Sequence, residues 1–305
     1  MTDATFIELR HVLFGVAYRM LGSRTEADDV LQEAYLRWSK TDRSDVESPR
    51  AYLTSIVTNL SIDQLRKAKA RRETYHGPWL PEPIVADDDC GIVHPGGIVD
   101  PEGIVDPGGI ADSLSLAFLV LLEELAPLER AAFLLREVFG YGYPDISETL
   151  GRNEAACRQL VSRARHRIGE RQRRFDADKE RSRQLMQKFV VACGTGDISE
   201  LMTLLAEDVV LWSDGGGQAK AAPRPVVGPW RTARWLTHVA RTFPPDIVVS
   251  DVRLNGQPGL LFAENDTVTS ALVLDVTDGR IVGIKIVANP MKLTGLQRVT
   301  RTEEP

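Results

Sequence analysis

Arginines are concentrated in one short part of an otherwise acidic chain. Eight arginines and two glutamates lie between residues 152 and 174, although the whole chain of 305 residues has a formal net charge of −6. Arginine can bind guanine O6 and N7 with two hydrogen bonds, glutamine can bind adenine in the same way, and serine or further arginines can hold phosphates. A local basic stripe of this kind is typical of a nucleic-acid contact, because only one face of the protein has to be positive.

The spacing within GRNEAACRQLVSRARHRI, residues 151–168, predicts an amphipathic helix that begins after Asn153 as its N-cap. A short helix over 144–150 and a turn at Gly151 precede it, which indicates a helix-turn-helix. Cys157, Leu160, Val161, Ala164 and Ile168 form the apolar stripe. The candidate DNA contacts on the other faces are Arg152, Asn153, Ala155, Arg158, Gln159, Ser162, Arg163 and Arg165. The alternative is a solvated helix with an arginine-rich face.

A second group of residues could do acid–base chemistry near the C-terminal end. Asp214 and His238 could form an acid/base pair in a cavity lined by Trp212, Trp230 and Trp235. A turn aspartate, a surface histidine and core aromatics explain the same residues, and we favour that interpretation, so we predict no enzyme activity and no catalytic residue. Gly215, Gly216 and Gly217 indicate a close backbone approach or a mobile loop, not a phosphate-binding loop, because no Lys-Ser/Thr follows them.

The cysteines argue against disulfides and metal sites. Cys90, Cys157 and Cys193 are odd in number, far apart and without CxxC spacing, which favours a reducing cytosol. We predict no metal and no cofactor. The amphipathic N-terminus is not a signal peptide, and no run approaches the roughly 18 apolar residues of a membrane span. The expected location is therefore the cytoplasm, with no membrane contact.

The elements that must position these residues fall into four parts. Residues 1–75 read as a helical bundle with N-caps at Ser23 and Ser48, and 113–174 as further helices ending in the helix-turn-helix. Between them, 76–112 is a Pro/Gly-rich linker whose hexapeptide repeats over 91–112 are too short, and too rich in proline, for a β-helix. Residues 175–305 predict an α+β domain with an antiparallel sheet and tight turns at Asn255-Gly256 and Asp278-Gly279.

Two polar faces occur in the first bundle. The second helix carries acidic and amide side chains in DDVLQEAYLRW, namely Asp28, Asp29, Gln32 and Glu33. The third helix aligns Asn59, Asp63 and Arg66 and then runs into a basic end that includes Lys67 and Arg71. Taken alone, these faces are most often solvated or salt-bridged surfaces, although the second could track single-stranded DNA.

In order along the chain, these stretches resemble one family. DDVLQEAYLRW followed by SPRAYLTSIVTNLSIDQLRKAKARR is similar to region 2 of the extracytoplasmic-function (ECF) sigma factors of bacterial RNA polymerase, and LAPLERAAFLLREVFGYGYPDISETLGRNEAACRQLVSRARHRI is similar to their region 4. The resemblance implies a multidomain chain with two all-α sigma domains that binds core polymerase and promoter DNA. By resemblance, Asp28, Asp29, Gln32 and Glu33 would contact the clamp helices of the largest subunit, and region 4 the beta flap. Asn59, Asp63, Arg66, Lys67 and Arg71 would engage the −10 element, and the arginine-rich helix the −35 element.

The C-terminal part resembles the SnoaL-like domain, a cone-shaped α+β fold, as found in a subgroup of these sigma factors called the SigJ type. The marks of that subgroup are three loops, whose residues here include Trp79, Asp214, Gly215, Gly216, Gly217, Asn289, Pro290 and Lys292. Gln218 and Met291 depart from the subgroup pattern, which expects Lys and Asp. The resemblance implies regulation in cis without a separate anti-sigma factor, and leaves a small ligand of this domain open. The alternatives are a helix-turn-helix regulator with a ligand-sensing domain and a cyclase or isomerase tethered to DNA.

Overall fold

The computed structural model describes residues 4–42, 44, 46–73, 75–85, 114–169 and 179–297, which form two compact units. The first unit contains the helices of residues 4–73 and 114–169. The second contains residues 75–85 together with 179–297. The hexapeptide repeats over 91–112 lie outside the described residues. Each unit is described by itself below.

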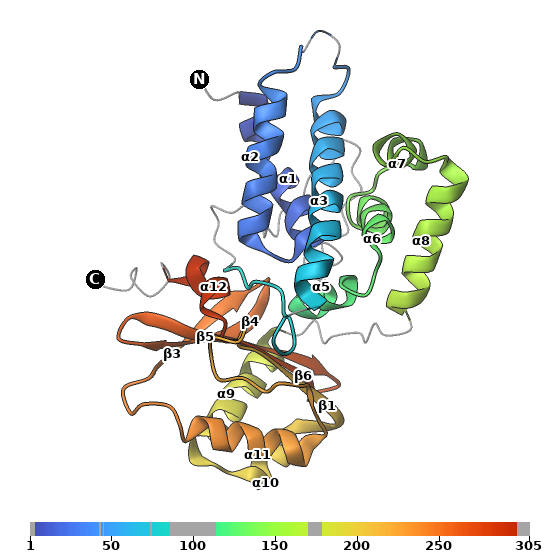
Figure 1. The fold of residues 1–305 in the computed structure, drawn as a ribbon. Coiled ribbons are helices and arrows are strands. Elements are labelled where there is room, and N and C mark those ends of the chain that lie inside the picture. The colour runs from blue at the N-terminus through green and yellow to red at the C-terminus, as the bar shows by residue number, and fades with distance from the viewer. Residues whose placement is uncertain are drawn as a thin grey trace. The chain divides into compact units, whose positions relative to one another are not determined.

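The first unit begins with three long helices, coloured blue in Figure 1: α1 (Ala4–Leu21), α2 (Arg24–Trp38) and α3 (Pro49–Glu73). The two predicted N-caps are confirmed, because the Ser23 hydroxyl accepts from the Glu26 amide at 3.2 Å and the Ser48 hydroxyl from the Ala51 amide at 3.3 Å. Leu53 and Val57 of α3 are fully buried, as their apolar spacing predicts. Burial of such side chains is the main force that holds the bundle together.

The second half of this unit contains α5 (Leu116–Leu122), α6 (Pro127–Phe133), α7 (Tyr143–Leu150) and α8 (Glu154–Gly169). From the sequence alone, Pro127 and Gly140 are typical of the first residue of one helix and of the residue that follows its end. Instead, the α-helix ends at Phe133 and continues as a π-helical turn, Leu134–Val138, whose wider winding lets the Phe139 amide reach the Leu134 carbonyl at 3.0 Å.

The predicted helix-turn-helix is present as α7 and α8. Gly151 sits between the two helices with φ of +58°, a left-handed conformation that glycine adopts without steric cost. The Asn153 side chain accepts from the Ala156 amide at 2.8 Å, so this residue is the N-cap of α8 as predicted. The turn therefore fixes the direction in which α8 leaves α7.

The two halves of the first unit pack on each other. The hydroxyls of Thr54 on α3 and Tyr141 are 2.9 Å apart. The guanidinium of Arg130 on α6 donates to the carbonyl oxygen of Met20, near the end of α1, at 2.6 Å, and forms an ion pair with Glu123 at 2.8 Å. Burial lowers the pKa of Arg130 to about 9, which leaves it charged at neutral pH.

The described part of the second unit contains a six-stranded sheet in the order β2-β1-β6-β5-β4-β3. The strands are β1 (Leu205–Asp214), β2 (Val226–Val227), β3 (Val248–Leu254), β4 (Gln257–Glu264), β5 (Thr267–Thr277) and β6 (Arg280–Val287). Neighbouring strands are antiparallel, as predicted, except that β1 and β6 are parallel. That exception arises because β1 reaches β6 through a long crossover and not through a hairpin.

Three tight turns connect the antiparallel strands of this unit within the described residues. Asn255-Gly256 and Asp278-Gly279 have positive φ at both positions, which is the turn geometry that their sequence predicts. Asn265-Asp266 makes a third such turn, although its sequence lacks the glycine that marks the other two. Asn and Asp tolerate this left-handed conformation better than other non-glycine residues.

Helices cover one face of this sheet (Figure 1). They are α9 (Lys179–Thr195), α10 (Ile198–Leu204) and α11 (Pro229–Ala240), and their apolar side chains share a core with strand residues. A short α12 (Pro290–Leu293) and a 3₁₀ turn, Thr294–Leu296, follow β6. This combination of helices and a mostly antiparallel sheet is the predicted α+β fold.

Residues 75–85, which we call the strap, run along the second unit. The Asn255 amide donates to the Ile84 carbonyl at 2.8 Å, and the Ile84 amide donates to the Asn255 side chain at 3.1 Å. Val85 forms an antiparallel bridge with Leu254, and Leu80 is fully buried. The prediction placed 76–85 in an interdomain linker. These contacts show instead that this part belongs to the second unit, because its backbone and apolar side chains are fixed there.

Candidate functional site

The face of α8 that was predicted to contact DNA is exposed. The buried residues are Cys157, Val161, Ala164 and Ile168, which confirms four of the five residues of the predicted apolar stripe, while Leu160 is half-buried. All eight candidate contacts from Arg152 to Arg165 are exposed. The geometry therefore leaves their polar atoms accessible to a large ligand such as duplex DNA.

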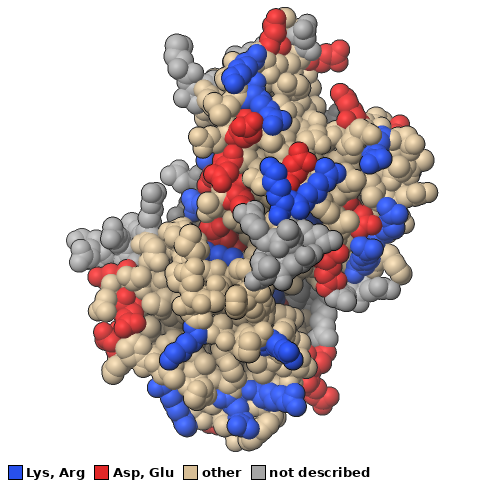
Figure 2. Space-filling model, viewed as in Figure 1, with Lys and Arg blue, Asp and Glu red and all other residues tan. Residues whose placement is uncertain are grey.

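Most arginines on α8 already have acidic partners. Arg158 pairs with Glu154 at 2.6 Å, and its guanidinium lies 4.9 Å from the centre of the Tyr143 ring. Arg165 pairs with Glu137 at 2.7 Å, and this ion pair raises the pKa of Arg165 above its usual value. Figure 2 shows red and blue side chains intermingled over the helical unit. A DNA phosphate or base must therefore compete with carboxylates for these side chains.

A buried glutamate fixes α8 to α6. Glu129 is 6% exposed and accepts from Arg163 at 3.1 Å and from Arg167 at 2.8 Å. Its carboxylate also accepts from the Ala126 amide at 3.3 Å, at the start of α6. Arg163 thus has a structural partner as well as an exposed position, which the sequence pattern did not indicate.

The acidic face of α2 is exposed to solvent. Asp29 and Gln32 are exposed, whereas Asp28 pairs with Arg10 at 3.1 Å and Glu33 with Arg37 at 3.0 Å. Leu36 lies one turn further along α2 and is 46% exposed. A single exposed leucine is common on protein surfaces, so Leu36 marks a contact surface only together with the neighbouring exposed polar residues of α2.

The polar face of α3 is partly occupied by the other half of the unit. Asn59 donates to the Thr149 carbonyl on α7 at 3.0 Å, and Asp63 pairs with Arg66 at 3.0 Å on the exposed surface. Lys67 is exposed, and the side chain of Arg71 lies outside the described part. The Asn59 amide would have to leave Thr149 before it could contact a base.

Asp214, at the end of β1, is the centre of a polar cluster beneath the strap. Its side chain is fully buried. It accepts from the Tyr75 hydroxyl at 2.6 Å, the Leu80 amide at 2.8 Å, the Gly216 amide at 3.0 Å and the Lys292 ammonium at 2.7 Å. A buried carboxylate is tolerated when it is paired and hydrogen-bonded in this way.

Lys292 and Asn289 complete this cluster, which we call the strap anchor. The Lys292 ammonium also donates to the Leu80 carbonyl and lies 4.1 Å from the centre of the Trp79 ring. Asn289 donates to the Tyr75 hydroxyl at 2.8 Å and caps α12, in which Pro290 is the first residue. Burial, then the hydrogen bond to Asp214, raises the pKa of Tyr75 well above its usual value, so the phenol stays a donor.

The glycines after Asp214 pack closely against this anchor. Gly216 has φ of +57°, and a Cβ there would overlap the Asn289 side chain. A Cβ at Gly215 would overlap the backbone of Ala219. The sequence predicted a close backbone approach at these glycines, and that interpretation is confirmed. The two departures from the subgroup pattern, Gln218 and Met291, are exposed and lie outside the anchor.

Asp214 and His238 do not form the acid/base pair that the sequence left open. Asp214 faces the strap, while His238 is exposed and lines a cavity to which Asp214 does not belong. Of the three tryptophans expected around a cavity, Trp235 lines it. Trp230 is 54% exposed, and Trp212 lies under the Lys285 ammonium.

Comparison with known proteins identifies both halves of the helical unit. The Sigma-70 region 2 family model matches residues 6–71, and the Sigma-70 region 4 model matches residues 115–168. The ECF RNA polymerase sigma factor SigJ of Mycobacterium tuberculosis is 33% identical over 315 residues, which cover 100% of this chain and 97% of that protein. The chain belongs to the ECF sigma factor family.

The structural comparison extends this result to the second unit of the sigma factor. The crystal structure of Mycobacterium tuberculosis SigJ matches with a TM-score of 0.72 and 31% identity, over 95% of this chain and 97% of that one. Because the SigJ match spans both units, the α+β unit of the sigma factor is the SnoaL-like domain. A partial relative is the ECF sigma factor SigW of Bacillus subtilis, which is 41% identical over 59 residues, or 19% of this chain and 32% of that protein. None of the described helices of this chain is both long and apolar enough to cross a membrane.

Proposed function

We propose that this sigma factor binds core RNA polymerase in the cytoplasm, recognises −35 and −10 promoter elements, and starts transcription. The observation that carries the proposal is that a region 2 and a region 4 occur in order in one chain, with exposed polar residues on α2 and α8. Asp29, Gln32 and the neighbouring Leu36 form the surface offered to the clamp helices of the largest subunit, together with Asp28 and Glu33. Region 4 contacts the beta flap.

Region 4 reads the −35 element through α8, and region 2 engages the −10 element through α3. The residues assigned to the −35 element are Arg152, Asn153, Ala155, Arg158, Gln159, Ser162, Arg163 and Arg165. Those assigned to the −10 element are Asn59, Asp63, Arg66, Lys67 and Arg71. The Asn59–Thr149 hydrogen bond and the ion pairs on α8 must open on DNA. We therefore expect the free chain to bind DNA weakly and the polymerase to supply much of the affinity.

Arg158→Ala should weaken binding of the polymerase complex to the −35 element by about 1–3 kcal/mol and relax base preference there, because arginine can bind a guanine edge with two hydrogen bonds. The measurement is competition binding with promoter duplexes changed one base pair at a time. Arg183→Ala is the matched control, since Arg183 is an exposed arginine on α9 of the other unit. An equal loss of affinity on every sequence would make Arg158 a phosphate contact.

We further propose that the SnoaL-like domain modulates the sigma regions in cis, without catalysis and without a separate anti-sigma factor. The strap follows α3 directly in the chain and is fixed to the domain through the strap anchor. The candidate catalytic aspartate, Asp214, is occupied by structural donors. This arrangement supports a mechanical role for Asp214 and a link between the domain and the helix assigned to the −10 element.

Run-off transcription with purified core polymerase tests both proposals. We expect the full chain to direct specific transcripts from selected promoters, and truncation after Asp176 to change their yield. Unchanged yield would remove the proposed role of the SnoaL-like domain. If neither form initiates transcription while the full chain still binds duplex DNA alone, the protein is a helix-turn-helix regulator.

A further inference from the structure

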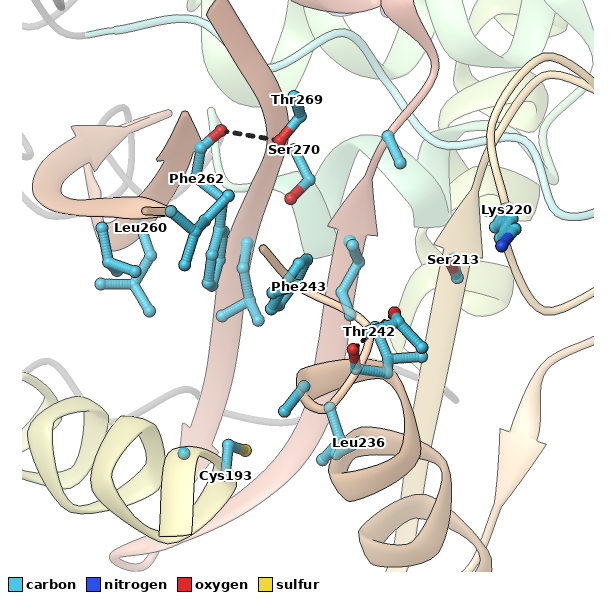
Figure 3. A pocket seen from close by; sticks show the side chains of 18 of the residues that line it. Cys193, Ser213, Lys220, Leu236, Thr242, Phe243, Leu260, Phe262, Thr269 and Ser270 are labelled. Carbon is cyan, nitrogen blue, oxygen red and sulfur yellow. Dashed lines mark hydrogen bonds between the residues drawn. The ribbon is translucent and has the colours of Figure 1, made fainter. Parts of the chain in front are cut away.

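The SnoaL-like domain contains a cavity of about 660 Å³ between the sheet and the helices α9 and α11 (Figure 3). This volume lies within the range of small-molecule sites, roughly 300–1,000 Å³. Much of the lining is apolar and aromatic. Six of the apolar side chains are Phe189, Trp235, Phe243, Leu260, Phe262 and Leu272. The cavity is separate from the strap anchor, because Asp214 and Lys292 do not line it.

Two serines in the cavity wall have hydroxyls without a hydrogen-bond partner among the described residues. Ser213 on β1 is 1% exposed and Ser270 on β5 is 7% exposed. The hydroxyls of Thr242 and Thr269 in the same wall are satisfied by backbone carbonyls at 2.8 and 3.1 Å. Neither serine oxygen is among the fully buried side-chain atoms without a hydrogen-bond partner, so each hydroxyl faces the cavity, where water or a ligand can bond to it. The two serines are therefore candidate contacts for a ligand.

The sheet register places the two serines apart on the same face. Ser213 is paired with Ile286 on β6, which is paired with Leu272 on β5, and Ser270 lies two residues from Leu272 along β5. Ser213 and Ser270 are two strand spacings apart across the sheet and two residues apart along β5, which together place them roughly 12 Å from each other. The surface between them is formed by Ile286 and Leu272, which are both apolar. A ligand that reaches both hydroxyls must therefore be extended and apolar in its middle.

The deep part of the cavity is uncharged. Burial raises the pKa of Cys193 to about 12, which keeps its thiol neutral at physiological pH. The charged side chains of the lining are Lys220, which is exposed, and Glu264, which is half-buried. A charged ligand body would lose its hydration without gaining an ion pair among the deep residues.

We propose that this cavity binds an uncharged, ring-containing small molecule that has hydrogen-bonding oxygens at its two ends, held by Ser213 and Ser270. This inference rests on the proposed regulatory role of the SnoaL-like domain and names the ligand class of that domain. Rings fit because they fill an apolar, aromatic-lined volume at a small entropic cost.

The cavity and the strap anchor are built from the same two backbone segments. Ser213 lines the cavity while the next residue, Asp214, holds the strap, because successive strand residues point to opposite faces. At the end of β6, Ala288 lines the cavity and Asn289 holds the strap through Tyr75. A ligand that shifts β1 or the start of the 289–293 segment therefore shifts the strap as well.

Binding is tested on the full chain with Nile red, a neutral fused-ring dye whose fluorescence rises in apolar surroundings. We expect saturable binding, weakened at least tenfold by Ser270→Phe, which fills the cavity, and roughly two- to tenfold by Ser213→Ala, which removes one hydrogen bond. Ser250→Phe is the matched control: Ser250 lies on β3, pairs with Leu261 and does not line the cavity. The anionic dye 1-anilinonaphthalene-8-sulfonate should bind at least tenfold more weakly than Nile red.

The proposed site is overturned if Nile red does not bind. It is also overturned if Nile red binds equally to the wild type and to Ser270→Phe while circular dichroism shows that both are folded. Equal binding of the anionic dye overturns the uncharged class. Hydrogen exchange of the 75–85 peptide tests the coupling, since the Leu80 amide donates to Asp214. Binding without a change in exchange there removes the link to the strap. Run-off transcription tests the sigma function separately, because Nile red can bind the cavity whether or not the chain starts transcription.

Discussion

Replacing Asp214 by alanine is expected to lower the free energy of unfolding of the second unit by about 3–5 kcal/mol. The carboxylate is fully buried and accepts from Tyr75, Leu80, Gly216 and Lys292. Its removal leaves the buried Leu80 amide without the acceptor it has here and takes the Asp214 carboxylate away from the Lys292 ammonium, which is 12% exposed. Urea unfolding and the exchange rate of the Leu80 amide would measure the loss.

A graded series separates charge from hydrogen bonding at this position. Asp214→Asn keeps an acceptor oxygen and should cost less than Asp214→Ala. Asp251→Ala is the control, because Asp251 is 54% exposed and its partner Arg183 is 4.0 Å away, so we expect a change within about 0.5 kcal/mol. If Asp214→Ala behaved like Asp251→Ala, the strap would not depend on this carboxylate.

We expect Asp214→Ala to release the strap from the SnoaL-like domain. The strap is continuous with α3, the helix assigned to the −10 element, so its release should change promoter-specific transcription in the same direction as truncation of the SnoaL-like domain. Opposite directions would mean that the domain acts on the sigma regions by a route other than the strap.

Replacing Arg130 by alanine is expected to destabilise the helical unit by about 3–5 kcal/mol. Its side chain is 3% exposed and joins α6 of region 4 to the Met20 carbonyl at the end of α1 in region 2. The change removes a buried ion pair with Glu123 and also the packing of the arginine stem. Urea unfolding followed by helical circular dichroism would measure it.

Two further variants define the role of Arg130. Arg130→Met keeps most of the volume without the hydrogen bonds, and a smaller loss than for alanine would assign the difference to packing. Arg10→Ala is the control, because Arg10 is 58% exposed and pairs with a half-exposed Asp28, so its expected effect is below about 1 kcal/mol. A cost for Arg130→Ala no larger than that of Arg10→Ala would contradict the prediction.

Region 2 and region 4 contact each other through the face of α3 that we assign to the −10 element. Asn59 is hydrogen-bonded to Thr149, and Thr54 to Tyr141, so part of the α3 face packs on region 4. Under the proposed assignment of Asn59 to the −10 element, we expect binding to polymerase to replace these contacts. The acidic partners of the α8 arginines also lower the expected affinity of the free chain for DNA, because they weaken the attraction of these arginines to phosphate.

Local signals in the sequence predict most helix boundaries and turns, and two sequence motifs indicate the family. Caps at Ser23, Ser48 and Asn153 and the glycine at 151 mark helix boundaries through hydrogen bonds and φ angles that depend on neighbouring residues alone. The apolar spacing of α8 likewise fixed which arginines are exposed. The tight turns at Asn255-Gly256 and Asp278-Gly279 follow from the same local rules.

Which distant residues meet depends on the packing of the folded chain. Periodicity does not reveal that the segment around Trp79, the loop after Asp214 and the tail at Lys292 converge, because their contacts span 78 to 214 residues of chain and depend on packing. For the same reason, the sequence predicts a linker over residues 76–85 and leaves the partners of Asp214 open. The same holds for Ser213 and Ser270, whose unpaired hydroxyls become visible only when the sheet register sets them in one cavity wall.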